Sequence, residues 1–185
     1  PFNWRGWWDY GTGALGDMAC HTANMAFMAL KLGFPVSVEA KTGPINPETY
    51  PAWATVTFQF PERDGLPPLK FVWYEGKTPD GKKNLPAPKY LYGEKPPGSG
   101  SLLVGDEGTL YSPNDYGAAY KLFPKEKFAK VEKPKPWLPR NGKGDSGMKE
   151  EWVQAIQAGK PSIALSNFLY SKHLAKLFIS KTMAQ

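Results

Sequence analysis

The sequence contains one cysteine and two histidines among its 185 residues, and these scarcities exclude several classes of protein. Cys20 has no second cysteine to pair with, so the chain is not a small scaffold built on internal disulfides. With so few histidine and cysteine side chains a metal site would lack ligands, and we expect no metal. No apolar run reaches the ~20 residues of a membrane-spanning helix, so we expect no membrane partner.

The composition is that of a globular protein with a sizeable core. Hydrophobic residues make up 41% of the chain and aromatic residues 14%, from which we predict one domain over residues 1–185. The net charge of +6 comes largely from lysines, many of them in the stretch 121–137. Glu126 and Glu132 interrupt that stretch and no nucleic-acid motif surrounds it, so we interpret it as a solvated connection and expect no nucleic-acid partner.

The chain begins at Pro1 rather than at a methionine. This start suggests a fragment from which an upstream domain or leader is missing. The compartment stays open on this evidence, either the cytoplasm or, after export, the periplasm.

Hydrophobic periodicity predicts an α+β protein. A helical pattern spans residues 13–32, and two more close the chain at 148–158 and 166–182. The first of these two carries Met148, Trp152, Ala155 and Ile156 on one stripe, and the second should face inward with Phe168, Ala175, Phe178 and Ile179. Strand patterns occupy residues 36–42, 53–60, 69–74, 101–104, 109–112 and 119–123. This order predicts an open, mainly antiparallel sheet with helices packed on one face.

The spacing of Gly11, Gly13 and Gly16 matches G-x-G-x-x-G, with Glu39 further on where an acidic ribose contact is expected in a dinucleotide site. That fingerprint needs a buried apolar strand directly upstream, whereas residues 2–10, FNWRGWWDY, are bulky, aromatic and charged. The following strands also lack intervening helices. We therefore interpret these glycines as positions where the backbone turns tightly or packs closely, and expect no cofactor to bind to this chain.

Asp17 and His21 are the candidate catalytic residues. They lie four positions apart on the first predicted helix, which places the carboxylate and the imidazole on one face. A neighbouring carboxylate can orient an imidazole and raise its basicity, as a general base for a hydroxyl proton requires. An alternative is a minor surface interaction. No nucleophile elbow accompanies the pair.

Residues 13–21, GALGDMACH, preceded by WWDY, resemble the G-G-x-x-x-D-x-x-x-H segment of the Gfo/Idh/MocA oxidoreductase family, in its bacterial branch with tryptophan-rich loops. Later stretches are similar too: LKLGFPVSVEA, TFQFP, LKFVWYEG, LLVGDEGTLY, EWVQAIQAGKPS and SNFLYS. The resemblance covers nearly the whole chain, but only the family's C-terminal substrate and oligomerisation domain. The N-terminal Rossmann domain, which binds NAD or NADP, is absent from it.

The resemblance implies an NAD(P)-dependent dehydrogenase acting on a sugar, cyclitol or related polyol, with the isolated domain inactive. His21 would be the acid/base and Asp17 its polar companion. Trp8 and Tyr10 would offer apolar faces to a sugar ring, with core or interdomain packing as their alternative. Asn24 stands where the family often has an acidic residue, which puts its substrate contact in doubt. Glu94, Lys95 and Pro96 repeat the family's E-K-P letters but follow the D-x-x-x-H segment, so we interpret them as ordinary loop residues.

Two other functions remain open. One is an NAD-recycling glycosidase of the same family, which would use the same Asp17 and His21. The other is a non-catalytic interaction domain whose polar strand face, with Thr55, Thr57 and Gln59, lies between subunits. The partners expected from the family are the chain's own Rossmann domain, a sugar-like substrate and further copies bound through the open sheet face.

Overall fold

The structure is a computed structural model that describes residues 3–96, 98–138 and 144–184. It divides into two compact units, one of residues 1–129 with 174–185 and one of residues 130–173. Helices and two antiparallel sheets make up the described chain, so the predicted α+β class is confirmed. The prediction of one domain over the whole chain stays a prediction.

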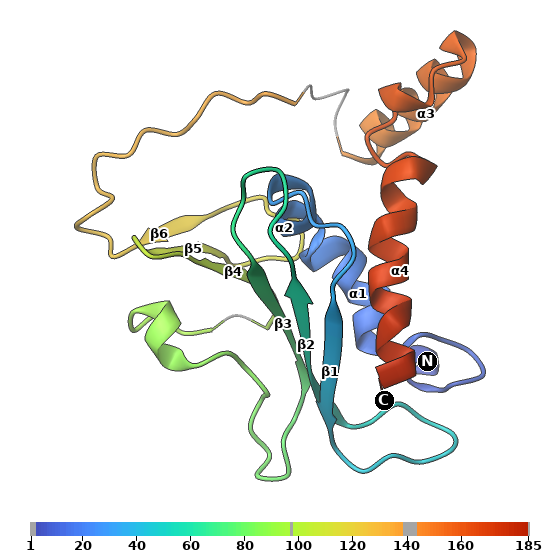
Figure 1. Cartoon of the computed structure of the whole chain (residues 1–185), viewed down its shortest axis with the longest axis vertical. Coiled ribbons are helices and arrows are strands. Elements are labelled where there is room, and N and C mark those ends of the chain that lie inside the picture. Colours follow the sequence, from blue (N-terminus) through green and yellow to red (C-terminus); the bar gives the residue numbers. More distant parts are fainter. Residues whose placement is uncertain (1–2, 97, 139–143, 185) are drawn as a thin grey trace. The chain divides into compact units, whose positions relative to one another are not determined.

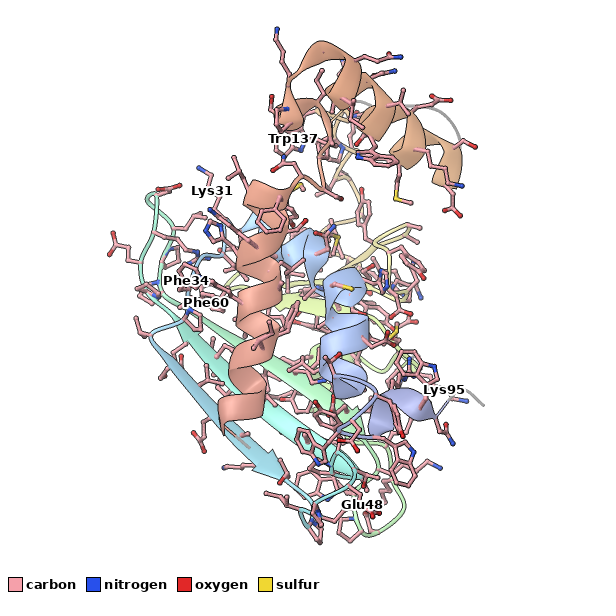
Figure 2. The ribbon with its side chains drawn as sticks, turned by 90° about the vertical axis from the view of Figure 1, so that its right-hand side faces the viewer. Lys31, Phe34, Glu48, Phe60, Lys95 and Trp137 are labelled. Carbon is pink, nitrogen blue, oxygen red and sulfur yellow. The ribbon has the colours of Figure 1, made fainter. Side chains whose placement is uncertain are left out.

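The first sheet has the order β1-β2-β3 and forms the centre of the larger unit (Figure 1). Its antiparallel strands are β1 (Ser37–Thr42), β2 (Trp53–Phe60) and β3 (Leu69–Gly76). β2 alternates as its sequence predicts, because Ala54, Val56, Phe58 and Phe60 are buried while Gln59 is exposed. Helix α1 (Gly13–Thr22) and the segment of α4 (Phe168–Ala184) from Leu174 onward lie over one face of this sheet (Figure 2).

The second sheet has the order β4-β5-β6. Its strands are β4 (Ser101–Val104), β5 (Thr109–Ser112) and β6 (Lys121–Phe123), all antiparallel. Leu91, at the end of the 3₁₀ turn η2 (Pro88–Leu91), packs with Tyr111, Phe123 and the half-buried Leu102 in a small core. The strands thus match the predicted positions but belong to two sheets rather than one.

The helix predicted over residues 13–32 is interrupted. α1 ends at Thr22, and α2 (Asn24–Ala29) begins after Ala23. At this break the hydroxyl of Ser101 donates a hydrogen bond of 2.7 Å to the backbone carbonyl of Thr22. Periodicity within 13–32 could not reveal the break, because the group at the break comes from β4.

The smaller unit contains α3 (Asp145–Ala158), the 3₁₀ turn η3 (Pro161–Ile163) and the start of α4. On the apolar stripe of α3, Ala155 is buried, whereas Met148, Trp152 and Ile156 are exposed by 63–65%. In α4, Phe168 and Ile179 are exposed by 83% and 61%, and Ala175 is also exposed. Phe178 is buried as predicted, and it shares the buried stripe of α4 with Leu174 and Leu177, at i, i+3 and i+4.

A search of the described helices finds none with both the length and the apolarity needed to cross a membrane.

Candidate functional site

Asp17 and His21 lie one turn apart on α1, in the larger unit. The sequence places them there because Leu15 and Ala19 turn into the core, with both side chains fully buried. The intervening face of the helix carries the polar pair, with Asp17 half-buried and His21 exposed. The imidazole is therefore open to solvent and to a ligand, as a proton acceptor has to be.

An ion pair joins Asp17 to Arg5. The guanidinium Nη1 donates to the carboxylate Oδ2 across twelve positions of sequence, and the two side chains are 34% and 40% exposed. Arg5 belongs to the 3₁₀ turn η1 (Trp4–Gly6), which packs against α1. The pair fixes the position of the Asp17 carboxylate one turn before His21.

The imidazole of His21 packs against the ring of Tyr116. Their centroids are 5.5 Å apart and the planes meet at 64°, an edge-to-face arrangement. Tyr116 belongs to the loop between β5 and β6 and is 74% exposed. The structure thus brings a residue nearly a hundred positions away to the candidate base.

A network of hydroxyl groups fixes that loop to the end of α1. Asp115 Oδ1 accepts hydrogen bonds from the hydroxyls of Thr22, at 2.9 Å, and Ser99. Thr22 directly follows His21 in the sequence and is 7% exposed. The same residue accepts the Ser101 hydroxyl at its carbonyl, so both β4 and the loop are bonded to the residue beside the candidate base.

The loop also has internal bonds that define its shape. Asn114 Oδ1 accepts the backbone N–H groups of Tyr116 and Ala118, at 3.0 and 3.1 Å. Gly117 follows with φ +65°, and a Cβ at this position would lie 3.0 Å from Met25 Sδ on α2. The backbone on both sides of Tyr116 is therefore determined by contacts that do not involve its own side chain.

The predicted sugar-contacting aromatics lie on the other side of the glycine turn. Trp8 packs on Tyr50 with ring centroids 3.8 Å apart, and its Nε1 donates to the Asn46 carbonyl at 3.3 Å. Tyr10 is 70% exposed. The contacts of Trp8 are those of its packing alternative, and substrate contact by either aromatic stays a prediction.

Asn24 is half-buried and is the first residue of α2, three positions after His21. The break in the helix at Ala23 separates it from the continuous helix on which the prediction placed it. Its role as a substrate contact stays a prediction.

A cavity of about 230 Å³ lies beside the start of α1. Arg5, Gly13, Tyr50 and Glu75 are among its lining residues. Asp17 and His21 do not line this cavity, whereas Arg5 lines it and also forms the ion pair with Asp17. This hollow is consequently a neighbour of the site, bounded by a cation and a carboxylate.

The glycines of the apparent dinucleotide fingerprint have packing roles. A Cβ on Gly11 would lie 2.5 Å from the Arg5 Cα, and Gly13 has φ +69° with the Tyr50 ring 2.9 Å from the same imagined atom. Within the described residues a 3₁₀ turn precedes these glycines, and the strands that follow are antiparallel. The context that a Rossmann phosphate site requires is lacking in this part of the chain.

Cys20 shares the exposed side of α1 with the candidate pair. Its thiol donates to the Asp17 carbonyl at 3.2 Å, and partial burial together with the Asp17 charge raises the pKa of the thiol. A raised pKa keeps the sulfur protonated, so Cys20 is a poor nucleophile. Among the residues that the structure describes, no group of three or more His, Cys, Asp or Glu side chains could bind a metal ion.

The sequence pattern pointed to Asp17 and His21 but missed Arg5, Thr22, Asp115 and Tyr116. Arg5 stood in a run of aromatics, where nothing about its spacing relates it to Asp17. The letters NDYG at 114–117 are typical of a turn and carry no chemical motif. Only the packing of the second sheet against the end of α1 brings them to His21.

Comparisons with known proteins identify no relative: no protein-family model matches the chain, and no curated protein matches its sequence.

Proposed function

We propose that this chain is the substrate half of an NAD(P)-dependent oxidoreductase that acts on a sugar, cyclitol or related polyol. The observation that carries the proposal is the exposed His21 imidazole on α1, one turn beyond the ion-paired Asp17. The motif resemblance of residues 13–21 suggests the reaction class, and the geometry suggests which atoms would move.

In the forward direction an alcohol carbon loses a hydride while its hydroxyl loses a proton. An imidazole nitrogen of His21 accepts that proton, and the carbonyl oxygen forms as the O–H bond breaks. In the reverse direction the imidazolium returns the proton to the oxygen. The side chain is exposed, so a substrate can approach it directly.

Asp17 and Arg5 contribute as a pair in this proposal. The Arg5 guanidinium restricts the Asp17 carboxylate to one orientation, one turn of α1 from the imidazole of His21. Asp17 then serves chiefly to position polar groups around the substrate.

The hydride acceptor would be a nicotinamide bound by a separate Rossmann domain. The strands of the described residues pair antiparallel, whereas a Rossmann domain binds its dinucleotide at parallel βαβ units. What this chain would supply is the proton acceptor, the polar companions and one wall of the substrate site.

The test uses the intact protein encoded by the complete gene. The purified protein is mixed with NAD or NADP and with a panel of sugars, inositols and sugar alcohols, and reduced nucleotide is followed by absorbance at 340 nm. The expected result is polyol-dependent reduction of one nucleotide. Absence of nucleotide reduction or oxidation with every panel member and its ketone would contradict the proposal.

Adding glycosides to the panel and measuring released sugar separates the two other functions. Release of a free sugar from a glycoside with no net reduced nucleotide would indicate the redox-recycling glycosidase. An interaction domain without chemistry would give neither reduced nucleotide nor free sugar, whether or not His21 is replaced.

A further inference from the structure

We infer that Tyr116 is the aromatic residue that contacts the substrate beside His21, and that Asp115 is a positioning residue that fixes it there. This inference rests on the proposed function and names a residue for the same site. The principal aromatic contact with the substrate would then come from the loop between β5 and β6 rather than from the segment before α1.

Tyr116 is in direct contact with the candidate base. Of the aromatic side chains considered for the site, Tyr116 packs directly on the His21 ring, at 5.5 Å between centroids. Trp8 instead packs on Tyr50. A polyol that reaches an imidazole nitrogen of His21 spans several ångströms around it. Such a substrate therefore comes within contact distance of the ring that packs on the imidazole.

The backbone at Tyr116 is held by hydrogen bonds although its ring is not buried. Tyr116 is 74% exposed, so its ring contributes little to the core. Its backbone is nevertheless defined by the Asn114 bonds, the turn at Gly117 and the Asp115 network. Because the backbone of this exposed tyrosine is already ordered, less conformational entropy is lost when its ring binds a ligand.

The chemistry of a tyrosine side chain also suits a polyol. A tyrosine ring offers an apolar face to the C–H surface of a sugar ring, and its hydroxyl can exchange hydrogen bonds with the sugar's hydroxyl groups. Edge-to-face packing on the imidazole leaves most of the Tyr116 surface uncovered, as its exposure shows. A cyclic polyol is the substrate class that uses both properties.

Asp115 acts through Tyr116 and does not itself have to contact the substrate. Its Oδ1 accepts the hydroxyls of Thr22 and Ser99, which bonds the base of the loop to the residue after His21. Replacement by alanine removes the acceptor and should release the loop. Replacement by asparagine retains an oxygen acceptor of the same shape and should restore the contact.

The first measurement is made on the 185-residue chain by NMR. The carbon-bound imidazole protons of His21 lie in the ring-current field of Tyr116, so Tyr116→Leu and Asp115→Ala should both shift their resonances. Asp115→Asn should keep them near the wild-type position. The matched control, Tyr120→Leu, removes an exposed tyrosine from the same loop and should leave them unchanged. Unshifted His21 resonances in Tyr116→Leu would overturn the contact, and this variant decides even if Asp115→Ala does not fold.

The second measurement uses the intact protein and a polyol that it oxidises. Tyr116→Leu should raise the KM for the polyol by on the order of tenfold, while the KM for the nucleotide stays unchanged. Asp115→Ala should do the same and Asp115→Asn should reverse most of the change. An unaltered polyol KM in Tyr116→Leu, with activity still dependent on His21, would refute this inference alone. A fully active His21→Ala variant would refute the proposed function instead, and no polyol turnover would refute both.

Discussion

The ion pair of Arg5 and Asp17 should contribute more to the proposed site than to the stability of the fold. Both side chains are more than a third exposed, and ion pairs of that kind contribute little to the free energy of unfolding. Their value would lie in orientation, because the guanidinium restricts a carboxylate one turn from His21. A substitution in the Arg5–Asp17 pair should therefore change activity more than it changes the free energy of unfolding.

Replacing Arg5 by glutamine should change the free energy of unfolding by no more than about 1 kcal/mol, as measured by urea denaturation of the chain. In the intact protein the same change should lower kcat/KM for the polyol, because Asp17 is no longer oriented. Lys31→Gln is the matched control, since Lys31 pairs with Asp64 on the surface at 3.5 Å. It should affect neither quantity, and equal loss of activity in both variants would contradict the role given to Arg5.

At the scale of elements, α1 is determined at its start by a glycine and at its end by groups from elsewhere in the chain. Gly13 begins the helix with φ +69° and the Tyr50 ring close by. Thr22 ends it, bonded to Ser101 and Asp115. The start could be predicted from the glycine turn, and the end could not, because its partners lie in the second sheet.

Gly13→Ala should destabilise the chain by about 1–3 kcal/mol, since alanine disfavours positive φ and its methyl group would press on Tyr50. Gly81→Ala is the control for backbone strain alone, because Gly81 has φ +78° and nothing within 4 Å of an added Cβ. Denaturant midpoints of the two variants measure the difference. A Gly13→Ala variant no less stable than Gly81→Ala would show that the close approach to Tyr50 carries no cost.

The turn after η2 is bonded to β6 through Glu94. Its carboxylate accepts from Lys121 Nζ and Lys125 Nζ, both at 2.7 Å, and these hydrogen bonds lower the pKa of Glu94 from its ordinary 4.5 to about 2. Tyr92 stacks on Phe123 beside it, with centroids 5.5 Å apart. These contacts explain Glu94 structurally, in line with the interpretation of the E-K-P letters as ordinary loop chemistry. Lys95, labelled in Figure 2, is exposed.

Because the pKa of Glu94 is lower in the folded state than in the unfolded state, its contribution to stability is complete above pH 4.5 and is lost as the pH falls towards 2. Glu94→Gln should therefore flatten the dependence of unfolding free energy on pH across this window. Urea denaturation between pH 2 and 7 measures it. Glu126→Gln removes another carboxylate from the lysine-rich stretch and serves as the control. Identical slopes for wild type and Glu94→Gln would contradict the assignment.

For the whole molecule, most of the secondary structure followed from the sequence, whereas the assembly of the site did not. The bounds of β2, β4 and β5 match the predicted ranges because alternation and turn residues are local signals. The predicted inward orientation of Phe168, Ala175 and Ile179 was wrong, because helical periodicity marks an apolar stripe without saying what covers it. Tyr116 and Asp115 were missed because tertiary packing alone relates them to His21.

The face of the first sheet opposite α1 supports the proposal of a homo-oligomer. Near one end of the face Asn84 donates to Thr55 Oγ1 at 3.0 Å, so a loop lies against it, while Thr57 is half-buried and Gln59 is exposed. On the neighbouring strand β3, Tyr74, Val72 and Lys70 lie opposite Thr55, Thr57 and Gln59. A surface of this mixed kind is typical of subunit contacts that stay soluble when separated.

Gln59→Arg should weaken self-association of the chain, because it places a cation where two copies would meet. Sedimentation velocity over a range of concentrations measures the change. Gln157→Arg alters an exposed glutamine on α3 and should leave the sedimentation coefficient unchanged. A wild-type chain that stays monomeric at every concentration would contradict association through this face.

The role of His21 as the proton acceptor is the centre of this account, and one pair of variants of the intact protein tests it most directly. His21→Ala should lower kcat/KM for the polyol by about 100-fold or more, as expected on loss of a general base. His173→Gln, at the only other histidine of these 185 residues, should retain wild-type kcat/KM. A His21→Ala variant as active as His173→Gln would contradict the account.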